Sequence, residues 1–405
     1  MTTARARGLM QNHRLMFFSR ALLNVRMFNV VLSLFYLARG LSLDQIFYAN
    51  IFWAVATLLF EIPSSYLADN WGRKKTLLLG VVFAILQWLI FFFGYGFVWM
   101  SLGAMCFGLF HACFSGTDSA LIYDTDKELG EEKRTLRSLG SYESAQYVLK
   151  IGAPLIASVI AKDLLDWQFH TLIAVDIVMS VIAIIFVARL TEPDHRMDVH
   201  KMESGIMHDA WNMFRRNPYL FRVMMNKELV FLGSLTLYLS FHAFLVARGI
   251  SVLVLGVGYA LFALSAFLWN RHIGRRETAN PGQHVQQLNM LFLATSALLL
   301  VGVFSSWTPL LFLVCIELLF FFESARSALY AEIFHKHFHS FNRATTLSLS
   351  NMLHNVAQIP MFFFLGIIIG IDTRFPFIVV VLTGLVTVVL FRLRPTRLPS
   401  QGAVV

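Results

Sequence analysis

Three ionisable residues lie deep inside long apolar stretches of the sequence. Arg26, Lys150 and Glu317 each fall about 14 to 17 Å from the start of an apolar run, if that run is helical with a rise of about 1.5 Å per residue. Charged side chains at such depth in a bilayer generally face a protein interior or a water-filled cavity. An arginine with a lysine suits an anionic group of a ligand. A carboxyl group surrounded by apolar side chains can bind and release a proton near neutral pH.

Polar side chains accompany these charges at helical spacing. Tyr147 precedes Lys150 by three residues, and an amide-rich face surrounds His354, so we expect both groups to orient a polar ligand. The residues predicted to bind the ligand are Asn24, Arg26, Asn29, Tyr147, Lys150, Asn351, His354, Asn355 and Gln358. An alternative is that the charges only fasten helices together, with Arg26 or Lys150 paired to Glu143 or Glu317.

Two acids near each other in one apolar run are candidates for proton coupling. Glu317 and Glu323 are six residues apart, and Glu323 shares a helical face with Arg326, with which it could pair. Glu317 is the better proton site of the two. A permanent salt bridge to a cation would silence it.

No motif of an enzyme or of a cofactor site is found. The sequence carries no phosphate-cradling loop, nucleophile elbow or metal-binding helix, so we expect neither an enzyme nor an ATP-driven pump, and no cofactor. His335, His337 and His339 alternate in a way that fits a solvated loop better than a metal site, and no metal is predicted.

The composition places these residues in an integral membrane protein. Of 405 residues, 57% are hydrophobic and 14% are charged. The net charge of +9 is attributed to loops that face anionic headgroups, and nucleic-acid binding is not expected. The three cysteines fall in apolar segments and predict no disulfide framework.

Twelve apolar runs are long enough to be membrane spans. They are placed at 15–38, 46–68, 76–96, 98–122, 141–162, 168–190, 222–246, 252–271, 286–305, 308–331, 345–370 and 374–392. Most of the loop arginines and lysines fall on one side, which predicts that both termini are cytoplasmic. The first apolar run has no cleavage site and is expected to be retained.

The most polar connection divides the chain into three parts. We expect a first six-helix bundle over 1–190, a cytoplasmic linker with an amphipathic helix over 191–219, and a second six-helix bundle over 220–405. Segments of the first half recur in the second. Ala38-Arg39-Gly40-Leu41-Ser42 matches Ala247-Arg248-Gly249-Ile250-Ser251, and Ser119-Ala120-Leu121 matches Ser327-Ala328-Leu329.

The loop around residues 64–77 resembles the signature loop of the major facilitator superfamily, G-x-L-A-D-R-x-G-R-R/K-x-x-L. Leu67, Ala68, Asp69, Gly72, Arg73, Lys74 and Leu77 match it, whereas Ser65 and Asn70 depart from it. With the internal repeats, the chain resembles a bacterial 12-helix branch of that family. The resemblance implies an all-α membrane protein with two pseudo-symmetric six-helix bundles, a substrate site near the midplane, and a monomer.

The resemblance also implies a cytoplasmic latch that controls opening. The gating residues carried over are Glu61, Asp69, Gly72, Arg73, Asp118 and Asp124. Their expected role is gating and not binding. The arginine that is typical of the fourth helix in proton-driven drug antiporters is absent, since His111 and Phe114 occupy that region.

These observations predict a secondary transporter in a bacterial inner membrane. It would move a small organic solute with an anionic group, such as a carboxylate metabolite or a siderophore-like compound, by alternating access, with protons as a candidate coupling ion. One alternative is a proton-driven exporter of hydrophobic drugs or amphiphiles, for which the many phenylalanines and methionines could form an adaptable wall. Another is a non-transporting membrane sensor or assembly partner with the same fold.

Overall fold

The computed structural model describes residues 3–194, 218–273, 280–305, 307–327, 329–330, 333 and 340–393. These residues form helices joined by short turns, and no strand occurs among them. Their contacts divide the chain into two compact units. Unit 1 consists of Met1–Met202, Leu239–Ala263 and Asn355–Ile371, and unit 2 of Glu203–Tyr238, Leu264–His354 and Asp372–Val405. The predicted division at residues 190 and 219 follows chain position instead, and it stays a prediction.

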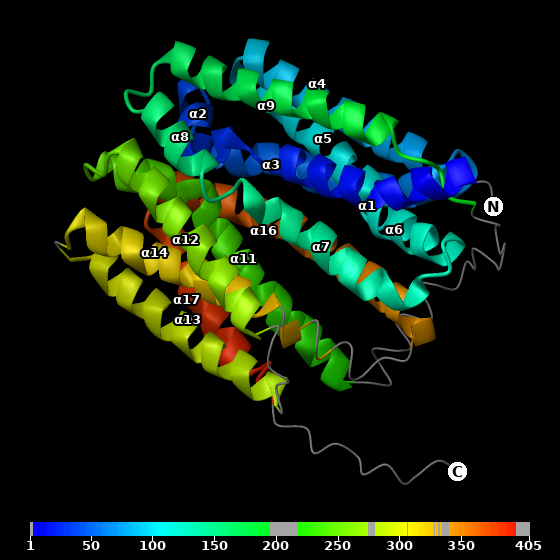
Figure 1. The fold of residues 1–405 in the computed structure, drawn as a ribbon. Helices are drawn as coiled ribbons and strands as arrows, with labels where there is room; N and C mark the ends of the chain where they lie inside the picture. Colours follow the sequence, from blue (N-terminus) through cyan, green and yellow to red (C-terminus); the bar gives the residue numbers. More distant parts are fainter. Residues whose placement is uncertain are drawn as a thin grey trace, which may run out of the picture. The chain divides into compact units, whose positions relative to one another are not determined.

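Unit 1 contains the helices of the first half of the chain. These are α1 (Thr3–Leu23), η1 (Met27–Val31), α2 (Leu32–Ala38), α3 (Leu43–Asn70), α4 (Arg73–Phe93), α5 (Gly96–Phe114), α6 (Thr117–Glu128), η2 (Glu132–Arg134), α7 (Thr135–Val148), α8 (Ala153–Ile160) and α9 (Asp166–Ala188). Figure 1 shows α4, α5 and α9 running alongside α1 and α3.

Local sequence explains several helix boundaries. Ser42 and Gln45 form a capping box that starts α3. Gly72, with φ of 111°, begins α4 in a conformation that a side chain would strain. Pro154 stands in the first turn of α8, where its missing N–H costs no hydrogen bond.

The core of unit 1 is packed between α1, α4, α5, α6 and α9. Met16, Val81, Cys113, Leu121 and Val187 are buried in one apolar cluster. At the contact of α3 with α5, Gly108 lets the two backbones approach closely: a Cβ there would collide with the Trp53 carbonyl oxygen. Small residues at helix contacts serve this purpose in membranes, where apolar burial alone does not favour association of helices.

Unit 1 also includes parts of three helices from the second half of the chain. These helices are α11 (Pro218–Ala247), α12 (Val252–Ile273) and α16 (Ser340–Ile371). The Ala243 N–H donates to the Ser33 hydroxyl at 3.3 Å, and the Tyr259 hydroxyl donates to the Asn29 carbonyl at 3.3 Å. The ends of α11 and α12 are therefore tied to the first membrane span within this unit.

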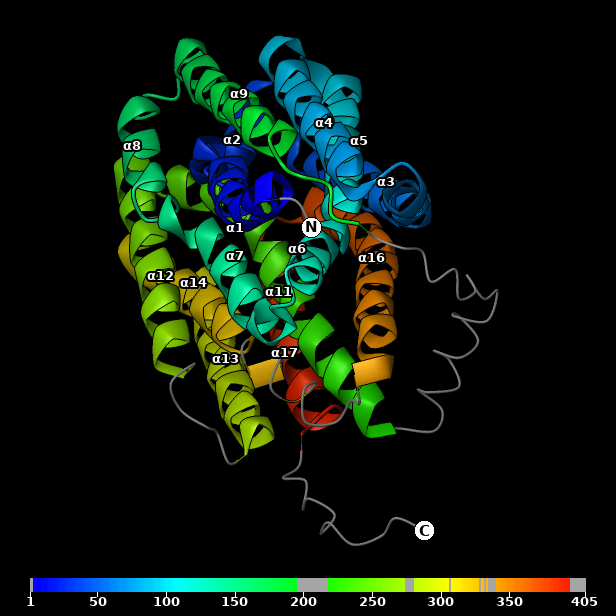
Figure 2. The same cartoon turned by 45° about the vertical axis from the view of Figure 1, so that its right-hand side comes forward.

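Unit 2 is built on the remaining helices. It adds α13 (Pro281–Val303), α14 (Pro309–Ala325) and α17 (Phe375–Val389) to the first part of α11, the last part of α12 and the first part of α16. Figure 2, like Figure 1, shows α13 beside α14 and α17. Its apolar core includes Met224, Val285, Leu329 and Ile333.

Each of the twelve predicted spans has a helical counterpart. Nine helical segments of the described residues are long and apolar enough to cross a membrane. The other three counterparts are α14, which has 17 residues, α17, which has 15, and the interrupted pair α7 and α8. The predicted amphipathic helix over 191–219 lies mostly outside the described residues, as do His335, His337 and His339.

Candidate functional site

The first predicted span is not one continuous helix. α1 ends at Leu23, and η1 begins at Met27 after a short irregular segment in which Arg26 adopts φ 41° and ψ 60°. A non-glycine residue in this left-handed region is strained by about 1 to 3 kcal/mol. Irregular backbone at membrane depth is tolerated where it is buried in protein or lines a cavity.

A buried carboxylate satisfies the backbone at this interruption. Asp176 of α9 accepts the Met27 N–H at 3.0 Å and the Phe28 N–H at 3.3 Å, and it is only 3% exposed. Amide groups at the start of a helix have no partner within the helix, so a carboxylate there stabilises them. Asp176 therefore stabilises the bend in which Arg26 lies.

The fifth predicted span is interrupted as well. α7 ends at Val148 and α8 begins at Ala153, so Lys150 lies in the turn between them. Its ammonium group is 5.6 Å from the Tyr147 ring centroid. The predicted helical spacing of Tyr147 and Lys150 is accordingly broken, because Lys150 is beyond the end of α7.

The two interruptions bring Arg26 and Lys150 into electrostatic interaction within unit 1. The Arg26 guanidinium lies 4.4 Å from the Phe107 ring centroid. Within the described part of the chain, Lys150 has no carboxylate at ion-pair distance. Glu143 is instead 3.2 Å from Arg20. Two cations near each other in a medium of low dielectric constant favour binding of an anion.

Other predicted binding residues lie on the turns of unit 1 or beside them. The Asn24 amide donates to the Arg20 carbonyl at 2.8 Å. Asn355 of α16 donates to Glu61 at 3.5 Å, and Glu61 accepts the Ser115 hydroxyl at 2.8 Å. Ser115 stands where α5 gives way to α6, so the fourth predicted span is the third that is interrupted.

A polar side chain without a partner lies on the same stretch of α16. Gln358 is fully buried, and neither its amide nitrogen nor its carbonyl oxygen has a hydrogen-bond partner among the described residues. Burial of such a group without a hydrogen bond is costly. Trp53 has an indole nitrogen in the same situation, beside His111 and Phe362. A polar ligand would satisfy these groups.

The acidic candidates lie in unit 2, and Glu317 differs from the rest. Both of its carboxylate oxygens are buried, and no hydrogen-bond donor or cation of the described chain reaches them. Glu323 interacts electrostatically with Lys227, Glu228 and His354. The salt bridge that would silence Glu317 is not found among the described residues.

His354 belongs to this acidic cluster and not with Asn355 and Gln358. Its Nδ1 is 2.6 Å from Glu228, which is 2% exposed, and its ring packs on Phe231 with centroids 4.5 Å apart. Lys227 is 3.6 Å from the other Glu228 oxygen. The side chain of Asn351, the remaining predicted binding residue of this helix, lies outside the described residues.

Arg326 interacts electrostatically with Glu323, as the spacing suggested, but its guanidinium group donates hydrogen bonds to other residues. It is 1% exposed and donates to Asn289 at 2.9 Å and to the Tyr330 hydroxyl at 3.3 Å. Tyr330 in turn donates to Asn226. These bonds connect α11, α13 and the end of α14, so Arg326 is part of a helix-linking network.

The predicted gating residues separate into two contacts. Arg73 is 2.5 Å from Asp124 and forms the expected ion pair between α4 and α6. Asp118 instead accepts the Tyr142 hydroxyl at 2.7 Å, with Arg20 3.7 Å away. Asp69 is exposed at the end of α3.

A residue outside the prediction holds the signature loop. The Glu192 carboxylate accepts the Arg73 N–H at 2.7 Å and the Lys74 N–H at 2.8 Å. It therefore caps the positive N-terminal end of α4. A Cβ on Gly72 would lie 3.3 Å from that carboxylate and would crowd it, and the φ of Gly72 itself favours glycine.

Sequence reasoning missed Asp176, Glu192 and Glu228. Asp176 and Glu228 are acids inside predicted spans, and the rule that singled out Glu317 would also have found them. Glu192 follows the last helix of the first half, and its local sequence indicates only the end of a helix. Nothing in its neighbourhood along the chain shows that it reaches a loop 119 residues earlier.

The sequence profile of the Major Facilitator Superfamily matches residues 16–359. None of the curated proteins matches the sequence. Similar solved structures include the nucleoside transporter NupG, with 14% identity over 95% of this chain and 97% of that one and a TM-score of 0.69. A bacterial homologue of the iron transporter ferroportin, in its inward-facing state, has 16% identity over 96% and 98% and a TM-score of 0.68.

A D-xylose-proton symporter also resembles the chain, with 11% identity over 95% of this chain and 97% of that one and a TM-score of 0.67. At these identities the likeness shows the fold and no substrate. The profile match covers most of the chain, and twelve helical spans carry the fold of these neighbours. The chain belongs to the Major Facilitator Superfamily and is a multi-pass membrane transporter, not an enzyme.

Proposed function

We propose that the protein moves a small organic solute with an anionic group across a bacterial inner membrane by alternating access. The observation that carries the proposal is the position of Lys150 beside Arg26, on the interruptions of two membrane spans. Discontinuous helices form substrate sites in many transporters, where the freed backbone lines a cavity. A carboxylate or similar anion would compensate Lys150, next to the Arg26 guanidinium group.

Other side chains of unit 1 suit recognition of an organic anion. Phe107 offers aromatic surface beside Arg26, Trp53 stacks on Phe107, and the Gln358 amide has a donor and an acceptor without a partner among the described residues. Tyr147, Asn24 and Asn29 would orient the bound group. Asn355 would contribute from the eleventh span.

We further propose coupling to protons through Glu317 and Glu323. No cation of the described chain reaches Glu317, whereas Arg326, Lys227 and His354 interact with Glu323. Water or a counter-charge that reaches Glu317 would change its protonation. The pair formed by Glu228 and His354 extends this cluster, with the His354 Nδ1 2.6 Å from Glu228. Both termini would face the cytoplasm, and the protein would act as a monomer.

A second candidate function is export of hydrophobic or amphiphilic compounds. It is favoured by the aromatic side chains of unit 1: the Trp53 and Phe107 rings stack with centroids 6.2 Å apart, and Phe362 packs on Trp53. Such a wall adapts to many ligands and also attracts organic cations. The third alternative is a non-transporting sensor with the same fold. A flux measurement tests it.

Binding to purified protein tests the substrate class. We expect carboxylate solutes to raise the unfolding temperature, because a ligand at about 100 times its Kd stabilises the native state by about 2.7 kcal/mol. Arg26→Gln and Lys150→Gln should each remove most of that shift. The matched control is Lys162→Gln, which alters an exposed lysine in the turn before α9.

Flux into proteoliposomes then separates the three functions. An anion that stabilises the protein should also be transported, and the two variants should transport it at least tenfold more slowly than the control. Stabilisation by lipophilic cations, unchanged in both variants, would favour the exporter. Binding without any flux would favour the sensor.

A further inference from the structure

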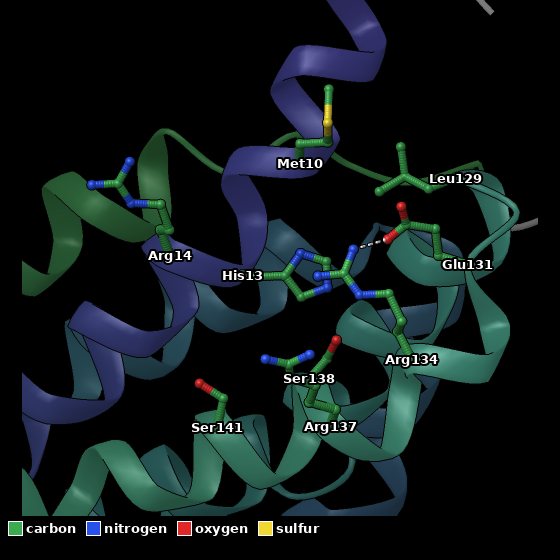
Figure 3. A pocket seen from close by; sticks show the side chains of 9 residues that line it. All are labelled: Met10, His13, Arg14, Leu129, Glu131, Arg134, Arg137, Ser138 and Ser141. Atoms are coloured by element: carbon green, nitrogen blue, oxygen red, sulfur yellow. Dashed lines mark hydrogen bonds and ion pairs between the residues drawn. The ribbon is translucent and has the colours of Figure 1, made fainter.

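A polar cavity lies apart from Arg26 and Lys150. It has a volume of about 400 Å³ and lies between the first half of α1, the turn around η2 and the start of α7 (Figure 3). Its lining residues are Met10, His13, Arg14, Leu129, Glu131, Arg134, Arg137, Ser138 and Ser141. None of them belongs to the proposed transport or gating residues.

The charge of the lining favours an anion. The lining contains three arginines and one glutamate, and Glu131 is already 2.6 Å from Arg134. Arg14 and Arg137 have no carboxylate at ion-pair distance in the described part of the chain. Figure 3 shows Arg134 and Arg137 directed toward the space beside the His13 ring, whereas Arg14 lies further along α1 with its guanidinium group turned away from that ring.

The hydrogen-bond donors suit a group with several oxygens. The hydroxyls of Ser138 and Ser141 line the wall formed by α7. The His13 ring is held by Asp126, 2.8 Å from its Nε2, so it is fixed in place at the wall. Arginine forks match phosphate oxygens in pairs, and a volume of this size holds a glycerol phosphate group.

The position of the cavity along the membrane normal also favours a phosphate group as the ligand. Residues 15–38 and 141–162 are predicted spans, so Arg14 and Ser141 stand just where two spans begin. Basic pockets between spans at this level bind the headgroups of anionic lipids. We propose that this cavity is a binding site for a phosphate ester, from either an anionic phospholipid or a soluble metabolite.

Purified full-length protein in neutral detergent tests the site. We expect phosphatidylglycerol, added to the detergent micelles, to raise the unfolding temperature by several degrees, and phosphatidylcholine to raise it much less. Native mass spectrometry should show one retained phosphatidylglycerol. The double variant Arg14→Gln with Arg137→Gln should lose at least tenfold in affinity for it.

Two further measurements identify the source of the phosphate ester and the specificity of the site. Glycerol 1-phosphate at millimolar concentration reproduces the shift if a soluble ester suffices, and it does not if the lipid chains are needed. The matched control is Arg7→Gln with Lys127→Gln, which removes the same charge from exposed positions outside the cavity. The proposal is overturned if neither phosphate ester binds, or if both double variants lose affinity equally.

Discussion

At the scale of single residues, the neighbours of a charge decide what it can do. Lys150 and Glu317 are both charged residues at membrane depth that lack an ion pair within the described chain. Arg326 is equally buried, but its guanidinium group is used by Asn289 and Tyr330. A buried charge whose bonds are complete stabilises structure, whereas one without them is available for a ligand or a proton.

Glu317→Gln tests proton coupling at this scale. Glutamine keeps the shape of the side chain but cannot release a proton, so uptake driven by a pH gradient should fall to the level measured without a gradient. Exchange of substrate at equal pH should continue, because it requires no net proton movement. Both rates are measured in proteoliposomes with labelled substrate.

Glu132→Gln serves as the control, since Glu132 is exposed at η2. It should leave gradient-driven uptake unchanged. If Glu317→Gln also retains gradient-driven uptake, Glu317 is not the coupling site, and the pair formed by Glu228 and His354 becomes the next candidate.

At the scale of elements, interruptions of the spans place the polar residues. The first, fourth and fifth predicted spans are each broken near Arg26, Ser115 and Lys150. Broken helices leave backbone groups that must find partners, since lipid offers none. The Asp176 carboxylate accepts hydrogen bonds from such groups at the first interruption, and the Glu192 carboxylate accepts them at the start of α4.

Asp176→Leu should destabilise the irregular segment between α1 and η1. Two buried N–H groups would lose their acceptor, at about 1 to 3 kcal/mol each, so the unfolding temperature should fall markedly. Asp176→Asn retains one carbonyl acceptor and should be much less harmful. The comparison is made by thermal unfolding in detergent, and equal losses in the two variants would contradict the assigned role.

Gly72→Ala should destabilise the signature loop by about 1 to 3 kcal/mol, because its backbone conformation is nearly exclusive to glycine. The added methyl group would also press on Glu192. Gly130→Ala provides the comparison, because Gly130 has φ of 73° but open space around its Cβ position. Thermal unfolding should show the larger loss for Gly72→Ala.

Truncating Glu192 to alanine separates the two effects. In that background Gly72→Ala should cost less than in the parent, since the crowded carboxylate is gone. An unchanged cost would mean that only the backbone conformation matters at Gly72.

At the scale of the whole molecule, the order of the spans predicts which loops share a side of the membrane. Lys75, at the start of α4, and Lys162, between α8 and α9, are both exposed. They should lie on opposite sides, with Lys75 in the cytoplasm. Cysteines substituted at the two positions test this with a membrane-impermeant maleimide.

In intact cells Lys162→Cys should be labelled, and Lys75→Cys should be labelled only after permeabilisation. The native cysteines Cys106, Cys113 and Cys315 are buried and should give little background. Labelling of both positions from outside, or the reverse pattern, would contradict the predicted orientation.

The class of protein, the twelve spans and the family follow from the sequence alone. Hydrophobic runs reveal spans because the bilayer requires about 20 apolar residues in succession, whatever the rest of the chain does. The motif at Asp69, Gly72 and Arg73 is local in the same way. Arg26, Lys150 and Glu317 could be found because a charged residue inside an apolar run is recognised without knowledge of its neighbours in space.

Only the tertiary structure decided how those residues are held. The helix breaks at Arg26 and Lys150, the reach of Glu192 to α4, and the division of His354 from Asn355 depend on contacts between segments distant in the chain. Hydrophobic periodicity carries no information on such contacts. Backbone that leaves the helix is stable only where a particular distant side chain, such as Asp176, completes its hydrogen bonds.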